Sequence, residues 1–558
     1  MIVRRASILI ASLLMLATVT GCPRKAVVSS GKATNKAASA EDLLKSAIHQ
    51  LRPENVGFAA APDKPVSLLN SWRGKLADAR QDGDGAEAET PAPPADWTSA
   101  EVEKRLKSDK FDELDAVHIR DCLLTHTLAT YLAARSNDEL QRVQEVFQFV
   151  VRNIALLGDD APELPISTYL ILMTGRGTPE DRAWICASVL RQLRIDCVIV
   201  RPSDAAKPAD GDWLLGVILN DRVHLFDAKL GLAIPSSSEA GPAGFKPATL
   251  AEIPDHAEWL QQLTARADQP YGIDAASLKE ARVMPIAEPG FWSRRMSRLE
   301  QVLSTESACI LFDPPTDDLG RSGLINRIQI ACPSLNHGNI TLWPYPERQL
   351  SMAHKTNSLK LQQMQQLAIE FGVYDRLGHT SPATFQQMQQ LCFSFNAPIT
   401  VRVDPQTGKP AGAVPERKML RIRTDQLLGK FEDATQRYLS IRHLEIEPSQ
   451  FSEVVQLHRL AAEDAIYWSG LSKFEAEEYA AAVEQLTGYI KRFDRKGRWT
   501  FAARSLLAEC RVRQGKFAEA VTAIERTVAE DPYREANAVR IKRWTPLAKQ
   551  TDDASDKQ

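Results

Sequence analysis

Residues Gly175–Pro202 read GRGTPEDRAWICASVLRQLRIDCVIVRP, and they predict a helix that leads directly into a strand. Thr178 is a favourable N-cap residue, Pro179 suits the first helical position, and the acidic residues that follow face the positive end of the helix dipole. We expect the helix to run to about Arg194 and the strand to cover Cys197–Val200. The apolar stripe of this helix consists of Ala183, Cys186, Leu190 and Leu193.

Helical patterns precede this segment and strand patterns follow it. Apolar residues at three- and four-residue steps predict helices at Glu101–Lys107, Asp112–Arg135 and Asn137–Ile154. Apolar runs predict strands at Asp196–Arg201, Trp213–Leu219 and Val223–Phe226. The last two strands are separated by Asn220-Asp221, which suits the tight turn of a hairpin. Helices followed by antiparallel strands indicate the α+β class.

The segment Gly175–Pro202, together with WLLGVILNDRVHLFDAKLG at Trp213–Gly231, resembles the core of the transglutaminase-like superfamily. The likeness covers roughly residues 112–235. It implies a papain-like fold over residues 97–240, in which a cysteine begins the helix. In that family a histidine begins one strand of the following hairpin, and an aspartate ends the next strand.

The positions of the family's catalytic triad are largely altered in this chain. The nucleophile position falls on Pro179, the histidine position falls on or near Asp212, and Asp227 matches the third member. A proline carries no nucleophile, so the resemblance implies the fold without the activity. We expect Asp227 to bind a backbone donor or Arg182, and His224 to point away from its apolar neighbours toward solvent.

One cysteine offers an alternative nucleophile. Cys186 lies two turns into the helix, within its apolar stripe. A buried thiol is less acidic and less reactive than an exposed one, so we interpret Cys186 and Cys197 as structural residues. An active acyltransferase or cysteine peptidase that uses Cys186 remains the alternative function.

The N-terminus resembles that of a bacterial lipoprotein. Residues Ala6–Gly21 are uncharged and mostly apolar, but too few to cross a bilayer, so residues 1–21 are predicted to be a signal peptide. The residues Val19-Thr20-Gly21-Cys22 resemble the lipobox, which implies a lipid on Cys22 and a membrane-anchored protein outside the cytoplasm. Residues 22–40 are expected to form a flexible tether.

Composition limits the kinds of partner and cofactor. The 558 residues include 68 basic and 71 acidic side chains, a balance that does not favour a nucleic-acid partner. Eight cysteines without a CxxC pair do not suggest a disulfide scaffold or a zinc ribbon. His118, Cys122 and His126 share one helix face at a spacing that suits metal ligands, yet no further ligand is evident. We therefore predict no metal and no cofactor.

The remaining segments are less regular. Residues 41–96 are expected to hold a short helix, placed at Ala40–Leu51, and a linker at Gln81–Asp96. Residues 241–450 are expected to form a mixed α/β middle region. Its predicted helices are Phe291–Thr305, with Arg294, Arg295, Arg298 and Glu300 facing solvent, Leu359–Phe371 and Pro382–Phe395. Its predicted strands are Cys309–Phe312, Ile328–Ala331, Ile340–Pro344, Ala397–Arg402 and Lys418–Arg423.

The C-terminal region contains two similar segments, Glu463–Phe493 and Phe501–Pro532, that are offset by 38 residues and resemble tetratricopeptide repeats. The resemblance implies an all-α helical module at 451–545, followed by a disordered tail at 546–558. The residues expected to pack the repeats are Gly470, Tyr479, Ala482, Ala508, Phe517 and Ala520. A peptide-binding groove and a plain helical end-domain both remain open.

Together these features favour a lipid-anchored envelope protein that binds or scaffolds a protein or peptide partner and performs no catalysis.

Overall fold

The computed structural model describes residues 38–55, 63–80, 99–158, 167–203, 212–237, 246–266, 268, 270–303, 308–313, 323–333, 341–355, 419–442 and 452–555. The predicted signal peptide, Cys22, the tether as far as residue 37 and the linker Gln81–Asp96 lie outside these residues. The helices predicted at Leu359–Phe371 and Pro382–Phe395 and the strand predicted at Ala397–Arg402 also lie outside them. Among the described helices, none is both long and apolar enough to cross a membrane.

The chain is a mixed α+β protein, as predicted, with an antiparallel sheet of five strands in the order β6-β5-β4-β3-β7. Strands β3 (Cys197–Arg201), β4 (Leu214–Leu219) and β5 (Arg222–Asp227) lie where the sequence predicted them. Asn220 and Asp221 both adopt positive φ, which matches the twist of a two-residue hairpin turn. Two edge strands, β6 (Leu232–Ala233) and β7 (Arg282–Pro285), were not predicted.

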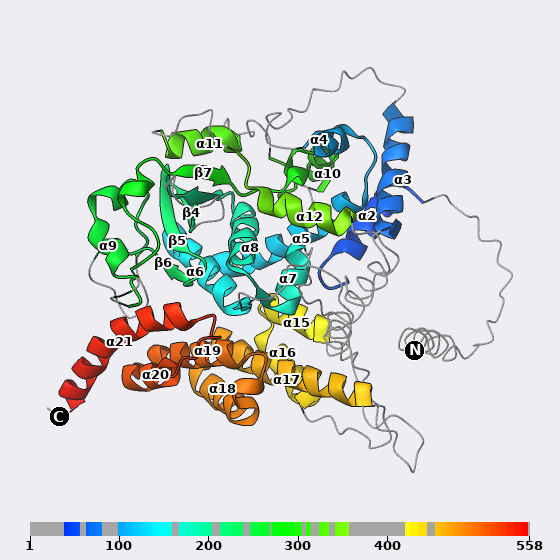
Figure 1. Ribbon diagram of the computed structural model, residues 1–558. Helices are drawn as coiled ribbons and strands as arrows, with labels where there is room; N and C mark the ends of the chain where they lie inside the picture. The colour runs from blue at the N-terminus through cyan, green and yellow to red at the C-terminus, as the bar shows by residue number, and fades with distance from the viewer. Residues whose placement is uncertain are drawn as a thin grey trace, which may run out of the picture.

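The four helices that come directly before the five-stranded sheet are α5 to α8, and two of them contact it (Figure 1). Helices α5 (Glu113–Ala133), α6 (Glu139–Asn153) and α8 (Pro179–Arg191) agree with the predicted helices, although α8 ends three residues earlier than expected. Helix α7 (Thr168–Thr174) was not predicted. The α6 helix contacts β4, and α8 contacts β3. We call these helices, together with the sheet, the body.

Helix α8 is the central helix of the body. Asp181 and Thr178 form a capping box, in which the Thr178 amide donates to Asp181 Oδ2 over 2.9 Å. Ten of its 13 residues are buried, so the helix is covered on all sides and not only along the predicted stripe. Just before α8, the two-residue strands β1 (Ala155–Leu156) and β2 (Arg176–Gly177) pair in parallel.

A second hydrophobic core lies beside the body. Helices α2 (Ala40–Leu51), α3 (Asp63–Arg80) and α10 (Arg294–Leu303) contribute to this core, which also includes the N-terminal part of α5; α4 (Ala100–Lys107) lies near it. Helix α2 has the predicted bounds, whereas α3 falls in a segment for which no helix was predicted. Arg295 was expected to face solvent, but it is buried and donates to both oxygens of Asp115, at 2.8 and 3.0 Å.

Several predictions for the middle region are wrong. Residues 309–312 and 341–343 have no regular structure, and Pro344 begins helix α12 (Pro344–Lys355). The segment predicted as the strand Ile328–Ala331 belongs to helix α11 (Leu324–Ala331), and most of Lys418–Arg423 belongs to helix α15 (Met419–Leu427). These apolar runs are four to six residues long, and periodicity alone cannot distinguish a strand from a buried helix at that length.

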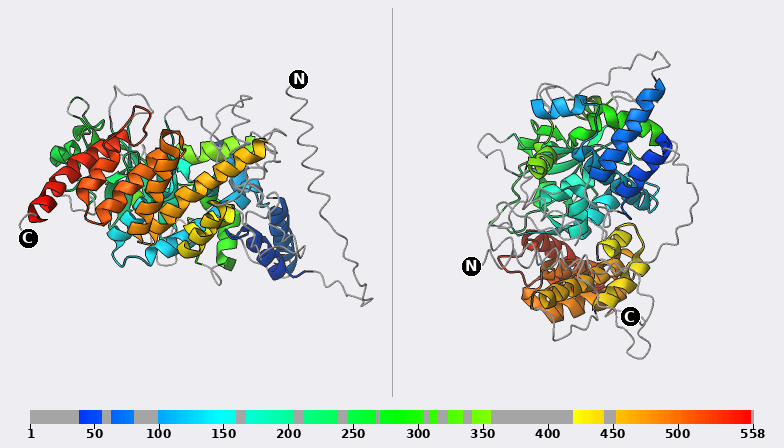
Figure 2. Two further views of the ribbon diagram at one scale, coloured as in Figure 1. Left: turned by 90° about the horizontal axis from the view of Figure 1, so that it is seen from below. Right: turned by 90° about the vertical axis from the view of Figure 1, so that its right-hand side faces the viewer.

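The C-terminal part is a row of helices that lies along one side of the body (Figures 1 and 2). Each helix contacts the next, in the order α15, α16 (Phe431–Arg442), α17 (Ser452–Glu475), α18 (Tyr479–Phe493), α19 (Thr500–Arg513), α20 (Phe517–Ile524) and α21 (Arg534–Ser555). We call this set the helical row. It begins with α15 and α16, which the sequence had assigned to the middle region.

The last helix extends farther than predicted. A tail without structure was expected from residue 546, but α21 continues to Ser555. Trp544 and Ala548 of α21 are buried in one cluster with Phe517 and Ile524 of α20. This apolar contact explains why the helix continues past Pro546, since packing outweighs the unfavourable propensity of an internal proline.

Candidate functional site

The first turn of α8 holds no thiol. Pro179 is its first residue and is half-buried, as the N-cap pattern predicted. Beside it, Asp181 is fully buried, and its Oδ1 accepts a hydrogen bond of 2.9 Å from the Tyr345 hydroxyl. A side chain on Gly177 would lie only 2.7 Å from Asp181 Oδ2. This end of the helix is therefore closely packed around the capping carboxylate, with little space for a reacting group.

The two aspartates expected from the resemblance, Asp212 and Asp227, lie close together but differ in environment. The register of β4 and β5 pairs Phe226 with Leu215, which brings Asp227 next to the start of β4 and so to Asp212. Asp212 is exposed. Asp227 is buried, and its two oxygens accept hydrogen bonds of 2.7 Å from the Leu230 amide and the Tyr271 hydroxyl. Burial raises the pKa of Asp227 above its ordinary value. The predicted backbone donor is confirmed, and Tyr271 is a partner that the sequence did not indicate.

Arg182 has a structural role in place of the predicted contact with Asp227. It is buried, and three of its nitrogens donate to the backbone carbonyl oxygens of Val151, Ile154 and Ala228 over 2.9 to 3.1 Å. These carbonyl groups belong to the end of α6, the residue after it and the residue after β5. Of the two partners expected for Asp227, the backbone donor is therefore the one observed, while the Arg182 guanidinium joins three backbone segments.

The described cysteines are all buried. They are Cys122, Cys186, Cys197, Cys309, Cys332 and Cys510. Burial raises the pKa of each thiol, to about 11 for Cys332. Cys186 has an exposed fraction of 0%. A thiol in such a setting forms little thiolate at neutral pH and is a poor nucleophile. The geometry therefore gives no support to Cys186 as a displaced nucleophile.

Of the three spaced residues of α5, the structure brings His118 and Cys122 together, with Cys122 Sγ 3.7 Å from His118 Nε2. His118 is buried, with Nδ1 3.2 Å from Glu288 Oε2 and Nε2 3.0 Å from the Leu311 carbonyl oxygen. Although burial opposes a charge on this imidazole, Glu288 raises its pKa. Glu288 also accepts a 3.0 Å hydrogen bond from the Trp184 indole. The cluster connects α5, α8 and two loops, and in the described parts of the chain no three potential ligands are grouped to hold a metal ion.

The residues singled out by the repeat pattern lie at contacts between helices of the row. A side chain on Gly470 would lie 2.9 Å from Leu486 Cδ2, so α17 and α18 approach closely there. Tyr479 packs edge-on against Phe474 with ring centroids 5.4 Å apart. The others are buried, three of them completely: Ala482, Ala508, Phe517 and Ala520.

One face of the helical row is covered by the body. On this face, Arg423 of α15 donates to the Leu172 carbonyl over 3.1 Å and to both oxygens of Asn153 over 3.0 Å. Glu475 at the end of α17 accepts two hydrogen bonds from Arg152, at 2.8 and 3.2 Å. A peptide cannot occupy this face of the described row unless the body moves away.

A further contact of this kind involves the start of α21. The Leu156 amide donates to the Tyr533 hydroxyl oxygen over 2.9 Å, and both residues are buried. Lys229 forms a 3.1 Å ion pair with Glu535 nearby. The row therefore contacts the body at α15, at the end of α17 and around the start of α21; Figure 1 shows the row lying beside the body.

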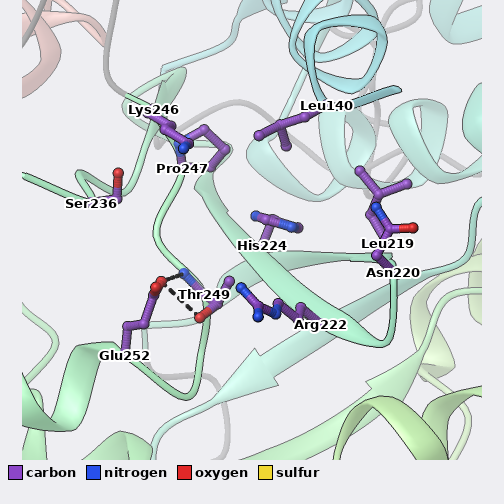
Figure 3. Close-up of a pocket in the computed structure, with 10 residues that line it drawn as sticks. All are labelled: Leu140, Leu219, Asn220, Arg222, His224, Ser236, Lys246, Pro247, Thr249 and Glu252. Carbon is purple, nitrogen blue, oxygen red and sulfur yellow. Dashed lines mark hydrogen bonds between the residues drawn. The ribbon is translucent and has the colours of Figure 1, made fainter. Parts of the chain in front are cut away.

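A cavity of about 530 Å³ lies at the opposite end of the β4–β5 hairpin from Asp227 (Figure 3). Its lining residues are Leu140, Leu219, Asn220, Arg222, His224, Ser236, Lys246, Pro247, Thr249 and Glu252. His224 lies on the opposite side of β5 from Val223 and Leu225, as predicted, but it faces this cavity and is only partly exposed. Burial lowers its pKa. The sequence did not indicate this cavity, because its walls come from separate segments.

Comparison of the chain with known protein families, with curated proteins and with solved structures finds no match.

Proposed function

We propose that this chain is a non-catalytic binding or scaffolding protein, anchored to a membrane of the bacterial envelope through a lipid on Cys22. Its body would be a transglutaminase-like domain that has lost the family's chemistry, and its helical row would be a tetratricopeptide-like module. The partner would be a protein or a peptide.

The observation that carries this proposal is the placement of the thiols. The first turn of α8 begins with Pro179, and each described cysteine is buried with a raised thiol pKa. Cysteine acyl transfer needs a thiolate with a base within hydrogen-bond reach. Among the described residues, only Asp227 would match a triad member of the family, and its carboxylate already accepts hydrogen bonds from Tyr271 and Leu230.

The extensive contact between row and body supports a scaffolding role. Buried polar contacts such as Arg423 with Asn153 and Arg152 with Glu475 hold the two parts in one arrangement. A rigid surface loses little conformational entropy when a partner binds, which favours recognition without chemistry. We expect the partner to contact surfaces of the row that face away from the body.

The direct test uses the unmodified protein. It is incubated with amine-donor and glutamine-acceptor peptides, and separately with iodoacetamide at pH 7, and the same assays are repeated with Cys186→Ala. We expect no turnover and slow alkylation that accelerates only in denaturant. Turnover or rapid alkylation that disappears in Cys186→Ala would instead establish the alternative, an acyltransferase or peptidase with a displaced nucleophile.

A further inference from the structure

The cavity at the end of the β4–β5 hairpin is built from segments held by backbone hydrogen bonds. Residues 246–252 run alongside β5, where the Leu225 amide donates to the Ala248 carbonyl and the Leu250 amide to the Val223 carbonyl, at 2.9 and 2.8 Å. This pairing places Thr249 beside His224. The start of α6 contributes Leu140 to the opposite wall (Figure 3). A volume of about 530 Å³ lies within the range of small-molecule sites.

Positive charge exceeds negative charge in this lining. Arg222 and Lys246 are both exposed, and neither forms an ion pair within the part of the chain that the structure describes. Glu252 is the acidic residue of the lining. Its Oε2 already accepts hydrogen bonds from the Thr249 amide and hydroxyl, at 2.9 and 2.8 Å. Glu252 also attracts Arg222 electrostatically, so two cations against one carboxylate leave a net positive charge in the lining for a ligand.

His224 adds a hydrogen-bonding group deeper in the cavity. Its ring forms a hydrogen bond with the Pro247 backbone, and its Nδ1 is buried without a hydrogen-bond partner among the described residues. A buried polar atom without a partner is costly, and a bound ligand could satisfy it. Figure 3 shows the imidazole between Leu140 and the Thr249 segment, with Arg222 on one side and Lys246 on the other.

We propose that this cavity binds a small molecule with an anionic oxygen group, a carboxylate or a phosphate. Arg222 and Lys246 supply the opposing charges, and the Ser236 hydroxyl donates a hydrogen bond. Nδ1 of His224 donates a second one when the imidazole is protonated, a state that a bound anion favours. The site is separate from the triad positions, because those lie at the other end of the hairpin. The inference goes beyond the proposed scaffolding role, and it does not depend on whether any thiol reacts.

The test measures binding of defined anions to the full chain by isothermal titration calorimetry. The probes are inorganic phosphate and succinate, and succinamide serves as the uncharged counterpart of succinate. The variants are the single substitutions Arg222→Gln and Lys246→Gln and the double variant that carries both. Lys279→Gln is the matched control, since Lys279 is an exposed lysine that does not line the cavity.

We expect the parent protein to bind phosphate or succinate saturably and to show no binding of succinamide. The double variant should bind at least about tenfold more weakly, and Lys279→Gln should bind as the parent does. Binding of phosphate alone would assign a phosphate ligand, and binding of succinate alone a carboxylate ligand. The proposal is overturned if neither anion binds, if succinamide binds equally well, or if the double variant keeps the parent affinity. Circular dichroism verifies that each variant is folded. If the double variant does not fold, the comparison is made with either single variant.

Discussion

Replacing Glu475 by glutamine is expected to weaken the contact between the helical row and the body. Glu475 and Arg152 have side-chain exposures of only 1% and 6%, and the guanidinium donates to both carboxylate oxygens. Although burial opposes the charge, Glu475 raises the pKa of Arg152. Glutamine keeps the shape of the side chain but leaves this buried cation without its counter-charge.

Removal of one partner of a buried ion pair typically costs about 3–5 kcal/mol, because the remaining charge is neither solvated nor paired. For a chain with a denaturant dependence of about 3 kcal/mol per molar urea, this loss lowers the unfolding midpoint by about 1–2 M. Glu477, two residues away, provides a matched control. Its carboxylate is 67% exposed and pairs with Arg135, so Glu477→Gln should change stability by less than about 1 kcal/mol.

The assay is urea unfolding of the full chain followed by circular dichroism and tryptophan fluorescence. Trp468 and Trp499 are buried in the helical row and Trp184 is buried in the body, so the fluorescence reports on both parts. The reasoning is refuted if Glu475→Gln and Glu477→Gln unfold at the same urea concentration.

Three further changes have defined outcomes. Ala520→Trp should destabilise the row by about 1–3 kcal/mol, because Ala520 is fully buried against α21, whereas Ala518→Trp at an exposed position should melt like the parent in circular dichroism. Burial raises the pKa of Asp121 from 3.8 to about 6, so its contribution to stability is greatest below pH 3.8 and is lost as the pH rises through 6. Asp121 also forms a 2.8 Å ion pair with Arg120, which Asn cannot form. Between pH 4 and pH 8 the stability of Asp121→Asn relative to the parent should therefore rise by up to about 3 kcal/mol, and a difference that stays constant with pH would contradict the assignment. Cys22→Ser should abolish labelling by palmitate and release the protein from the membrane fraction, and unchanged labelling would exclude lipidation at Cys22.

The elements that the sequence predicted well carry their own local signals. Helix α8 has an N-cap and a proline at its first position, α5 is long and periodic, and Asn220-Asp221 suits only a tight hairpin turn. Short apolar runs carry no such signal. The segment at Ile328–Ala331 became helical because its surroundings, and not its own pattern, decided the conformation.

The candidate sites were predictable only where one segment supplies the residues. Asp227 was singled out because it follows the predicted strand Val223–Phe226 inside the segment that resembles the family's hairpin. Its partner Tyr271 is 44 residues away, and Tyr345 is 164 residues from Asp181, so no local spacing connects either pair. The charged cavity was missed for the same reason, since Lys246 reaches Arg222 and His224 only through the pairing of residues 246–252 with β5.

The hydrogen bond between the Leu156 amide and Tyr533 has a consequence for the order in which the chain folds. The two residues are 377 positions apart, so the amide cannot gain this partner until nearly the whole chain is present. The same holds for Lys229, which pairs with Glu535. Contacts between such distant residues slow folding, because a long loop must close before they form. The body is thus expected to complete its native structure after synthesis, when α21 arrives, and a chain truncated before Tyr533 should remain partly folded and prone to aggregation.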